Sequence, residues 1–363
     1  MAPTSSAPLK LGLRLEVYRA AELKLPIETI LKAEALGYHS VWSAEAYGTD
    51  AITPLAYIAA LTRHIKLGTA IAQVAARPPT TLAMAAMSLD ALAGGDRVIL
   101  GLGLSGPQIV EGWYGQPWGK PNVRLRDYVN ILRQTLDRKA PVAYEGAEIS
   151  LPYRGPGALG QGKALRSILH PTSRIPIWIA AGGQRNVELA AELADGWLPM
   201  GLGPGGTPEY ATALDAGKAK RTAETVDGGF DVFNGVTVSI TDDVRGALDA
   251  AKPLTAMYVG GMGSETHHYH REAMARRGFP EAAARIGELW RAGRKEEAVA
   301  AVPDEYLEQT TLLGSPQRIR TSWEAGVVGP GVTGVIVGAE QPEALALMAD
   351  LAGLEPRTDG AHA

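Results

Sequence analysis

The chain has 363 residues, 46% of them hydrophobic and 20% charged, which is enough apolar material for a large core and excludes a disordered chain. Its 35 basic and 39 acidic side chains give a net charge of −4, which argues against a nucleic-acid partner. Cysteine is absent, which excludes disulfides, thiolate metal sites and cysteine nucleophiles. Residues 1–10 lack the apolar core of a secretory signal, and no apolar stretch reaches about 18 residues. The sequence therefore predicts a cytoplasmic protein with no membrane partner.

Short apolar runs alternate with amphipathic stretches along most of the chain. The apolar runs predict strands at 9–15, 40–44, 65–72, 97–104, 175–181, 196–201, 230–240 and 331–337. Helical spacing follows them at 26–36, 53–64, 80–92, 122–138, 186–194, 208–224, 242–251 and 342–352. Regular alternation of strand and helix predicts a parallel sheet, and eight such units favour an α/β fold closed into a (β/α)8 TIM barrel over an open sheet.

Two long segments interrupt this alternation. Residues 140–174 are rich in glycine and proline and contain a hairpin-like piece, VAYEGAEISL. Residues 256–314 predict several polar helices. Because neither segment contains the strands needed for a core of its own, the sequence predicts one domain over residues 9–354, with the two segments as excursions from it.

The active sites of (β/α)8 barrels lie at the carboxyl ends of the strands, so the informative residues are those that follow the predicted strands. Glu45 and Tyr47 follow the second strand. The run GLGLSG at 101–106 follows the fourth and matches a dinucleotide-binding pattern, but Pro107 comes next. About 20 residues on, where the pattern requires an acidic residue, lies a basic helix with Arg124 and Arg126. The same run falls short of a nucleophile elbow around Ser105, since proline replaces its last glycine. Both interpretations are weak.

The segment AGGQRN at 181–186 carries a stronger signal. It follows a fully apolar strand and opens a helix, so free backbone N–H groups and the helix dipole are available to an anion. Gly182 and Gly183 would let a phosphate approach the main chain closely. The alternative is a plain tight turn between strand and helix.

Three histidines stand close together in GSETHHYHRE, at His267, His268 and His270. A metal site would need convergent geometry and usually a carboxylate ligand as well. The favoured interpretation is a solvated loop or helix start, so no metal is predicted.

Several blocks of the sequence together resemble a known family. They include VWSAEAYGTDAITPLAYIAALT, IKLGTAIAQVAARPP, LDALAGGDRVILGLGLSGPQIVEGWYGQPWGKP, LPYRGPG, ADGWLP and YVGGMG. The chain resembles the luciferase-like (bacterial luciferase) superfamily over residues 11 to about 351. Within it, the chain is most similar to the branch of coenzyme F420-dependent oxidoreductases related to methylenetetrahydromethanopterin reductase.

The resemblance implies a flavin or deazaflavin ring in the mouth of a barrel with insertions. It implies a cis peptide bond between Ala70 and Ile71 after the third strand, against which the ring leans, and cofactor phosphate at the turn after the fifth strand. The residues expected to bind the cofactor are Glu45, Ala70, Ile71, Gln73, Ser105, Gln108, Ala181, Gly182, Gly183 and Gln184.

The chain also departs from well-studied relatives. Sugar-phosphate dehydrogenases of this branch carry an Asp-His pair after the second strand, where this chain has Glu45 and Ala46, and a glutamate after the fourth, where it has residues 105–108. Oxidation of glucose 6-phosphate is therefore not expected. Glu45 and Tyr47 are the expected catalytic residues, as candidates to handle a proton. The alternative for Glu45 is a carboxylate that only orients the cofactor.

The sequence therefore predicts a homo-oligomeric oxidoreductase that transfers a hydride between C5 of coenzyme F420 and a small organic substrate, in a direction left open. One alternative is an FMN-dependent monooxygenase of the same fold that uses oxygen. A second is a non-catalytic deazaflavin-binding protein.

Overall fold

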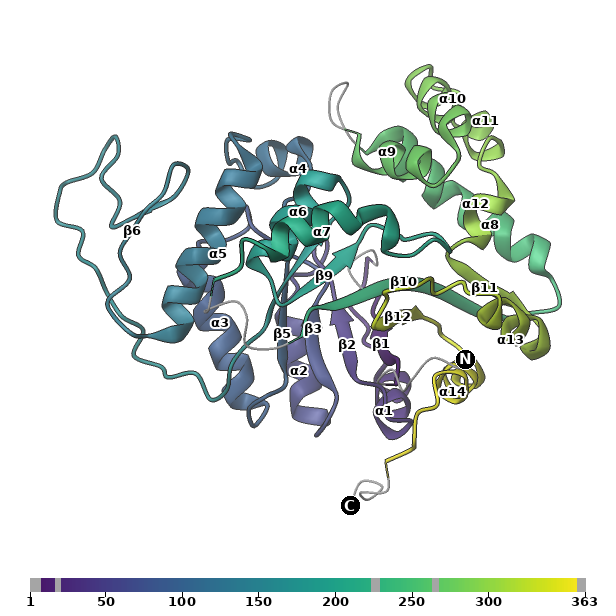
Figure 1. The fold of residues 1–363 in the computed structure, drawn as a ribbon, viewed down its shortest axis with the longest axis horizontal. Coiled ribbons are helices and arrows are strands. Elements are labelled where there is room, and N and C mark those ends of the chain that lie inside the picture. The colour runs from purple at the N-terminus through teal and green to yellow at the C-terminus, as the bar shows by residue number, and fades with distance from the viewer. Residues whose placement is uncertain (1–7, 17–20, 223–228, 263–267, 358–363) are drawn as a thin grey trace.

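The computed structural model describes residues 8–16, 21–222, 229–262 and 268–357. Its centre is a closed barrel of parallel strands (Figure 1). Each barrel strand pairs with the next along the chain, and β12 closes the ring by pairing with both β10 and β1. The barrel strands are β1 (Lys10–Arg14), β2 (Ser40–Ser43), β3 (Lys66–Thr69), β5 (Val98–Gly103), β8 (Ile177–Ala181), β9 (Gly196–Pro199), β10 (Asp231–Ile240) and β12 (Gly334–Gly338). The predicted (β/α)8 fold is confirmed.

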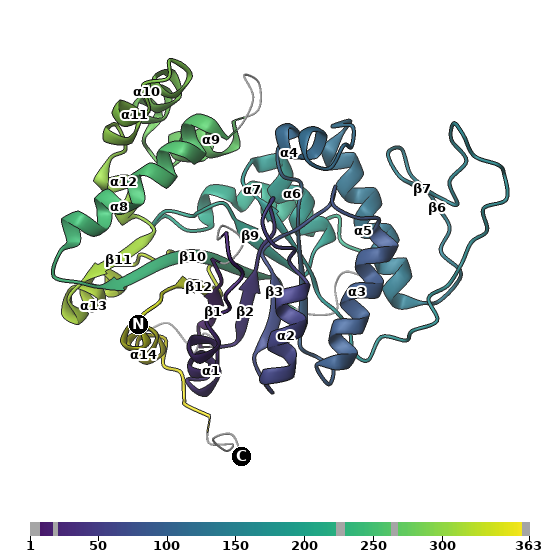
Figure 2. The same ribbon diagram turned by 180° about the vertical axis from the view of Figure 1, so that it is seen from behind.

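Helices surround the barrel, and one group stands apart from it (Figures 1 and 2). Several begin with proline in the first turn, where its missing N–H costs no hydrogen bond. The helices are α1 (Ile27–Ala35), α2 (Thr53–Leu61), α3 (Pro79–Leu92), α4 (Pro107–Gly112), α5 (Pro121–Asp137), α6 (Gln184–Leu193), α7 (Ala211–Lys218), α8 (Val244–Ala256), α9 (Tyr269–Arg276), α10 (Pro280–Arg291), α11 (Lys295–Ala300), α12 (Asp304–Glu308), α13 (Pro316–Glu324) and α14 (Pro342–Leu351). No helix in these ranges is long and apolar enough to cross a membrane.

The short elements differ from the sequence-based expectation. The helix predicted at 208–224 is a 3₁₀ turn, Pro208–Tyr210, followed by α7, and residues 223–228 lie outside the described ranges. Short strands occur in addition to the barrel strands. One is β4 (Ala72–Gln73), and two others, β6 (Tyr144–Glu145) and β7 (Ser150–Leu151), form a hairpin. A fourth, β11 (Thr311–Gly314), extends the sheet beside the second half of β10. The two-residue strands are too short to show a period, although the hairpin was expected, and β11 lies in the segment where polar helices were predicted.

The two excursions differ in how they pack. Helices α8 to α12 surround a hydrophobic cluster separate from the main core, with Leu248, Met274, Ile286 and Leu289 among its buried members. The sequence predicted polar helices here and did not reveal this cluster. Residues 140–174 extend away from the barrel beside α5 (Figures 1 and 2), and the side chains of Leu159, Leu165 and Ile168 are exposed.

The barrel interior is filled by large side chains. The ring of Trp178 packs against those of Trp42 and Phe233, with centroids 5.2 Å and 4.8 Å away, and these two rings also contact each other. Glycines on the inner face make room for these rings: a Cβ on Gly68 would lie 2.3 Å from the Trp42 indole, and one on Gly334 would lie 2.2 Å from the Phe233 ring. The interior is therefore a packed floor, and any ligand must bind above it, at one end of the barrel.

Gly68→Ala is expected to lower the free energy of unfolding by about 1–3 kcal/mol, because the added methyl group would overlap the buried indole of Trp42. Urea unfolding monitored by circular dichroism measures the change. Gly183→Ala is the matched control, since no atom lies within 4 Å of a Cβ placed there. An equally small effect at both positions would show that the indole moves aside at little cost.

Candidate active site

The carboxyl ends of the barrel strands form what we call the barrel mouth. Its wall carries small inward positions, Gly103 on β5, Gly235 on β10 and Gly338 on β12, above the aromatic floor. Helix α4 stands beside this end of the barrel, and α9 stands on the other side (Figure 1). Small residues above a packed floor leave space at the end of the barrel where enzymes of this architecture carry their sites.

Glu45 follows β2 and is held by four hydrogen bonds. Its Oε1 accepts from the backbone N–H of Gln73 at 2.7 Å and from Arg77 Nη1 at 3.2 Å. Its Oε2 accepts from the backbone N–H of Ala51 at 3.0 Å and from Arg77 Nη2 at 2.8 Å. The side chain of Glu45 is 3% exposed and that of Arg77 is 19% exposed. Both carboxylate oxygens are thus fully engaged, which favours the interpretation that Glu45 orients its surroundings.

The same network holds the turn after β3. The peptide bond between Ala70 and Ile71 is cis, at the position that the family resemblance indicates. The Ile71 carbonyl accepts from the backbone N–H of Glu45 at 3.3 Å, and the Ala70 N–H donates to the carbonyl of Ser43 at 2.7 Å. A Cβ on Gly103 would lie 2.6 Å from Ile71 Cγ1, so glycine is required there. Glu45, Ala70 and Ile71 therefore form one hydrogen-bonded group on the β2–β3 side of the mouth.

Gln73 joins this group from β4. Its Nε2 donates to the backbone carbonyl of Glu45 at 3.0 Å. Its Oε1 is buried and has no hydrogen-bond partner within the described residues. A buried acceptor without a partner costs free energy in the absence of a ligand, so this oxygen is suited to accept from a bound group.

Arg77 is a site residue that sequence reasoning missed. Burial lowers the pKa of this guanidinium, but the hydrogen bonds and charge of Glu45 outweigh burial and raise it above its usual value. The Arg77 carbonyl accepts from the hydroxyl of Tyr128 on α5 at 3.0 Å, and burial raises the pKa of that phenol well above its usual range. The block IKLGTAIAQVAARPP contained Arg77, but nothing in the sequence indicated that it meets Glu45.

Tyr47 has a different environment from Glu45. It is 57% exposed, and its ring packs edge-on against Trp113 at 6.3 Å between centroids. The hydroxyl of neighbouring Tyr114 donates to the Ala46 carbonyl at 3.1 Å, which ties the loop after β2 to the end of α4. Burial raises the pKa of Tyr114. Tyr47 is thus an exposed side chain on a loop that the hydroxyl of Tyr114 holds at Ala46.

Ser105 and Gln108 lie after β5, which is next to β3 in the barrel. Ser105 has a φ of +59°, a left-handed conformation that is uncommon outside glycine and frequent at functional turns. Gln108 lines an open depression on α4 together with Pro107, Glu111 and Gly112. The structure therefore places both residues between the Glu45 group and the turn after β8.

That turn comprises Ala181 to Gln184. The Ala181 carbonyl accepts from the indole N–H of Trp197 at 2.8 Å, and Gln184 Nε2 donates to the Glu209 carbonyl at 3.1 Å. Gly183 is the N-cap of α6 and supplies no side-chain acceptor to the first turn. A Cβ on Gly183 would meet no atom within 4 Å, so the approach to this helix terminus is open. Backbone N–H groups at such a terminus favour an anion.

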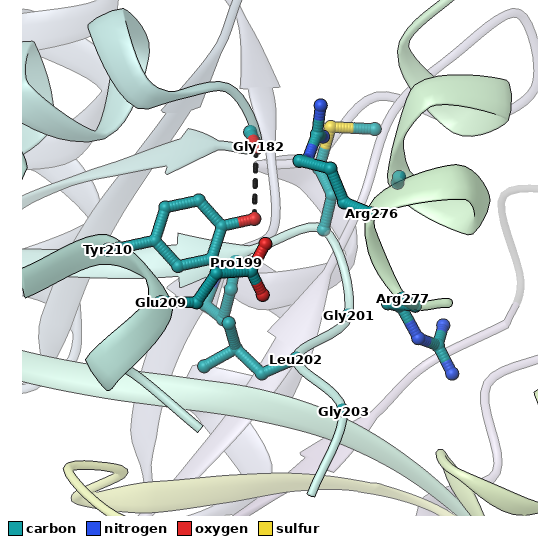
Figure 3. A pocket seen from close by; sticks show the side chains of 11 residues that line it. Gly182, Pro199, Gly201, Leu202, Gly203, Glu209, Tyr210, Arg276 and Arg277 are labelled. Carbon is teal, nitrogen blue, oxygen red and sulfur yellow. Dashed lines mark hydrogen bonds between the residues drawn. The ribbon is translucent and has the colours of Figure 1, made fainter. Parts of the chain in front are cut away.

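A pocket lies beside this turn (Figure 3). On one wall, the hydroxyl of Tyr210 donates to the Gly182 carbonyl at 3.2 Å. On the opposite wall, α9 brings Arg276, and Arg277 follows directly after it. The Arg277 guanidinium stacks on the Tyr306 ring at 4.1 Å from its centroid, so it is fixed in place. The pocket is therefore lined by Gly182 of the turn, by the acidic side chain of Glu209 and by two arginines.

The histidine cluster is only partly described. His267 lies outside the described ranges. The ring of His270 packs against that of Tyr258 at 4.7 Å between centroids, and burial lowers its pKa to about 4. His270 lies in the first turn of α9, as the helix-start interpretation expected, and its ring is partly buried by the contact with Tyr258. No cluster of three or more metal-binding side chains occurs within the described ranges.

The comparisons with known proteins agree with this geometry. The model of the family described as luciferase-like monooxygenase matches residues 15–334. The chain is 42% identical over 341 residues to a Mycobacterium tuberculosis protein named "Putative coenzyme F420-dependent oxidoreductase", covering 93% of this chain and 97% of that one. It is 30% identical over 322 residues to the 5,10-methylenetetrahydromethanopterin reductase of Archaeoglobus fulgidus, covering 87% and 91%.

A solved structure gives the same result. The coenzyme F420-dependent tetrahydromethanopterin reductase from Methanopyrus kandleri superposes with a TM-score of 0.70 at 25% identity, over 94% of this chain and 98% of that one. The family match and both relatives extend over most of the chain. The chain therefore belongs to the luciferase-like monooxygenase family.

Proposed function

We propose that the protein is a coenzyme F420-dependent oxidoreductase that transfers a hydride between the deazaflavin and a small organic substrate. The relatives named above support the choice of cofactor. The observation that carries the proposal is the group formed by Glu45, Gln73 and the cis peptide after β3, which borders a mouth walled by glycines. That group is buried, is held by hydrogen bonds and lies at the end of the barrel where enzymes of this architecture carry their sites.

The residues of the mouth fit such a cofactor at two places. The unpartnered Oε1 of Gln73 offers an acceptor to an N–H group at the edge of a ring. The open N-terminus of α6 at Gly183 offers backbone donors to a phosphate. Coenzyme F420, when bound, supplies the carbon that donates or accepts the hydride.

The protein supplies the remaining requirements of the reaction. Arg77 fixes Glu45, and Glu45 in turn fixes the backbone of Gln73, so that the turn after β3 keeps one shape. Such preorganisation lowers the entropic cost of orienting a bound ring and the substrate relative to each other. Because Glu45 has no open acceptor site, the accessible hydroxyl of Tyr47 is the better candidate for moving a proton.

Coenzyme F420 is expected to bind more tightly than FMN, which titrations followed by tryptophan fluorescence will measure. Mass spectrometry of the protein as purified identifies any cofactor that it retains. A clear preference for FMN would overturn the proposal in favour of the oxygen-using monooxygenase. Tight binding of F420 without turnover across a broad panel of alcohols, carbonyls, imines and alkenes would favour a non-catalytic binding protein.

Tyr47→Phe is expected to lower turnover by roughly 100-fold, the lower end of the range for a general acid–base group, while the affinity for F420 changes little. The substitution removes only a hydroxyl and keeps the edge-on contact with Trp113. The pH profile of turnover distinguishes a proton-transfer role from a structural one, because removal of a proton-transfer group would abolish one limb of the profile. An unchanged rate and profile would remove Tyr47 from the catalytic residues.

A further inference from the structure

Arg14 is the last residue of β1, and its side chain lies along the barrel wall over the neighbouring strand. Gly12, two residues earlier, faces the Trp42 indole inside the barrel, so Arg14 also points inward. Its Nη2 donates to Thr237 Oγ1 on β10 at 3.0 Å. Since β12 lies between β1 and β10, the guanidinium passes over β12.

Gly338 on β12 is the residue that makes this crossing possible. A Cβ at that position would lie 2.2 Å from Arg14 Nη2 and 2.6 Å from its Cζ. Any side chain there would displace the guanidinium. The Arg14 guanidinium therefore packs directly on the backbone of Gly338.

Within the described residues, Nη2 and Nε make the hydrogen-bond and ion-pair contacts of the guanidinium, and Nη1 makes none. Its Nε lies 2.5 Å from Glu16 Oε1, which orients the side chain along one edge. Its Nη1 is the one described atom within 4 Å of a Cβ placed on Gly235. The Arg14 side chain is 32% exposed, so a ligand can reach it. Glycines at 235 and 338 thus keep the wall around this cation free of side chains.

The position of Arg14 relates it to the proposed cofactor site. The strands run around the barrel in the order β1, β2, β3, β5, β8, β9, β10 and β12. The wall of β10 and β12 therefore lies across the barrel from β3 and β5, where the cis peptide and Gly103 are found. A ligand that rests against the cis peptide would turn its other face toward Arg14.

We propose that Arg14 binds a carboxylate of the substrate, so that the substrate is a small organic acid. This inference rests on the proposed function, because it takes the space between the two walls as the substrate site. A guanidinium recognises a carboxylate by paired, charge-assisted hydrogen bonds, and a neutral amide of the same shape cannot match them. The contacts to Thr237 and Glu16 hold the guanidinium in place before a ligand arrives, which lowers the entropic cost of binding.

The test compares acids with their amides in the F420-loaded protein. Calorimetric titrations with benzoate, benzamide, acetate and acetamide measure the preference for the charged member of each pair. The wild-type protein is expected to bind benzoate about tenfold more tightly than benzamide, which is the gain in affinity that one charge-assisted hydrogen bond gives. Added salt should reduce this difference. Arg14→Met is expected to abolish the preference, and Arg14→Lys to retain part of it.

Controls separate this role from others. Arg245→Met removes an exposed cation on α8 and should leave the preference intact. Thr237→Val removes the hydrogen bond that holds Nη2 and should weaken the preference while the charge remains, which serves as the test if Arg14→Met fails to fold. Equal binding of acid and amide by the wild type, or an unchanged preference in Arg14→Met, would overturn the inference.

The cofactor also carries acidic groups, so its affinity is measured separately. Titration of each variant with F420 alone, without any acid, shows whether Arg14 contacts the cofactor. If Arg14→Met weakens F420 binding and leaves the acid preference unchanged, the guanidinium serves the cofactor and the inference is wrong. If the wild type fails to bind F420, the proposed function fails, and the same acid and amide titrations on the cofactor-free protein still decide the role of Arg14.

Discussion

Glu45→Gln is expected to lower the free energy of unfolding by about 3–5 kcal/mol, the range for removing one partner of a buried ion pair. Glutamine has one acceptor oxygen, and its amide N–H groups would face the backbone N–H of Ala51 or Gln73. Arg77 would also keep a buried charge without its partner. Urea unfolding measures the stability, and F420 titration of the folded variant should show weaker binding because the turn after β3 loses its support.

A double-mutant cycle with Arg77→Gln isolates the pair. The double variant is expected to be more stable than the sum of the two single losses predicts, because it removes the unpaired charge that each single variant leaves. Turnover at saturating cofactor separates the two roles of Glu45. Unaltered stability and affinity together with a loss of turnover of 100-fold or more would mean that the carboxylate transfers a proton.

Gly183→Asp is expected to weaken F420 binding by roughly 100-fold, because like charges brought together at a binding site cost several kcal/mol. The new carboxylate would occupy the N–H groups of the first turn of α6 and repel a phosphate. Folding should not suffer. The backbone of Gly183, with φ −98° and ψ 154°, suits any residue, its surroundings are open, and aspartate is a favoured N-cap.

Gly183→Asn is the matched control for this variant. Asparagine has nearly the same size and also caps a helix, but it brings no charge. Its affinity for F420 is expected to fall between that of the wild type and that of the aspartate variant, and only the aspartate variant should recover with added salt. If F420 binds to all three proteins alike while thermal melting shows them folded, the turn after β8 serves only to connect strand and helix.

The period of the apolar residues was sufficient to predict the barrel, since it encodes which face of each element is buried. The helix predicted at 122–138 is α5, which begins and ends within one residue of that range. β4 was not predicted as a separate strand, because its two residues show no period. β11 was not predicted because it lies in a segment where polar helices were expected, and it pairs with the second half of β10. The helix predicted at 208–224 is shorter in the structure: it begins with a 3₁₀ turn, and its α-helical part is Ala211–Lys218.

Some features of the candidate site could likewise be predicted from the sequence, and others became visible only in the structure. The turn at Ala181 to Gln184 could be singled out from the sequence because glycines between an apolar strand and a helix leave backbone N–H groups available, which favours an anion. The location of the cis peptide followed from family resemblance and matches the structure. In contrast, the sequence offered Glu45 as a proton carrier, and only the structure revealed that Arg77, 32 residues away, completes its hydrogen bonds.

The sequence by itself thus determined the barrel, and it predicted the end of the barrel and the loops at which the candidate site lies. The tertiary structure decided what each polar side chain does there. Arg14 illustrates the reason: its role depends on Thr237 and Gly338, which come from strands more than 200 residues along the chain. Local periodicity specifies the buried face of an element, whereas hydrogen-bond and charge partners are specified by which strand ends meet around the barrel, and closure of the barrel alone brings them together.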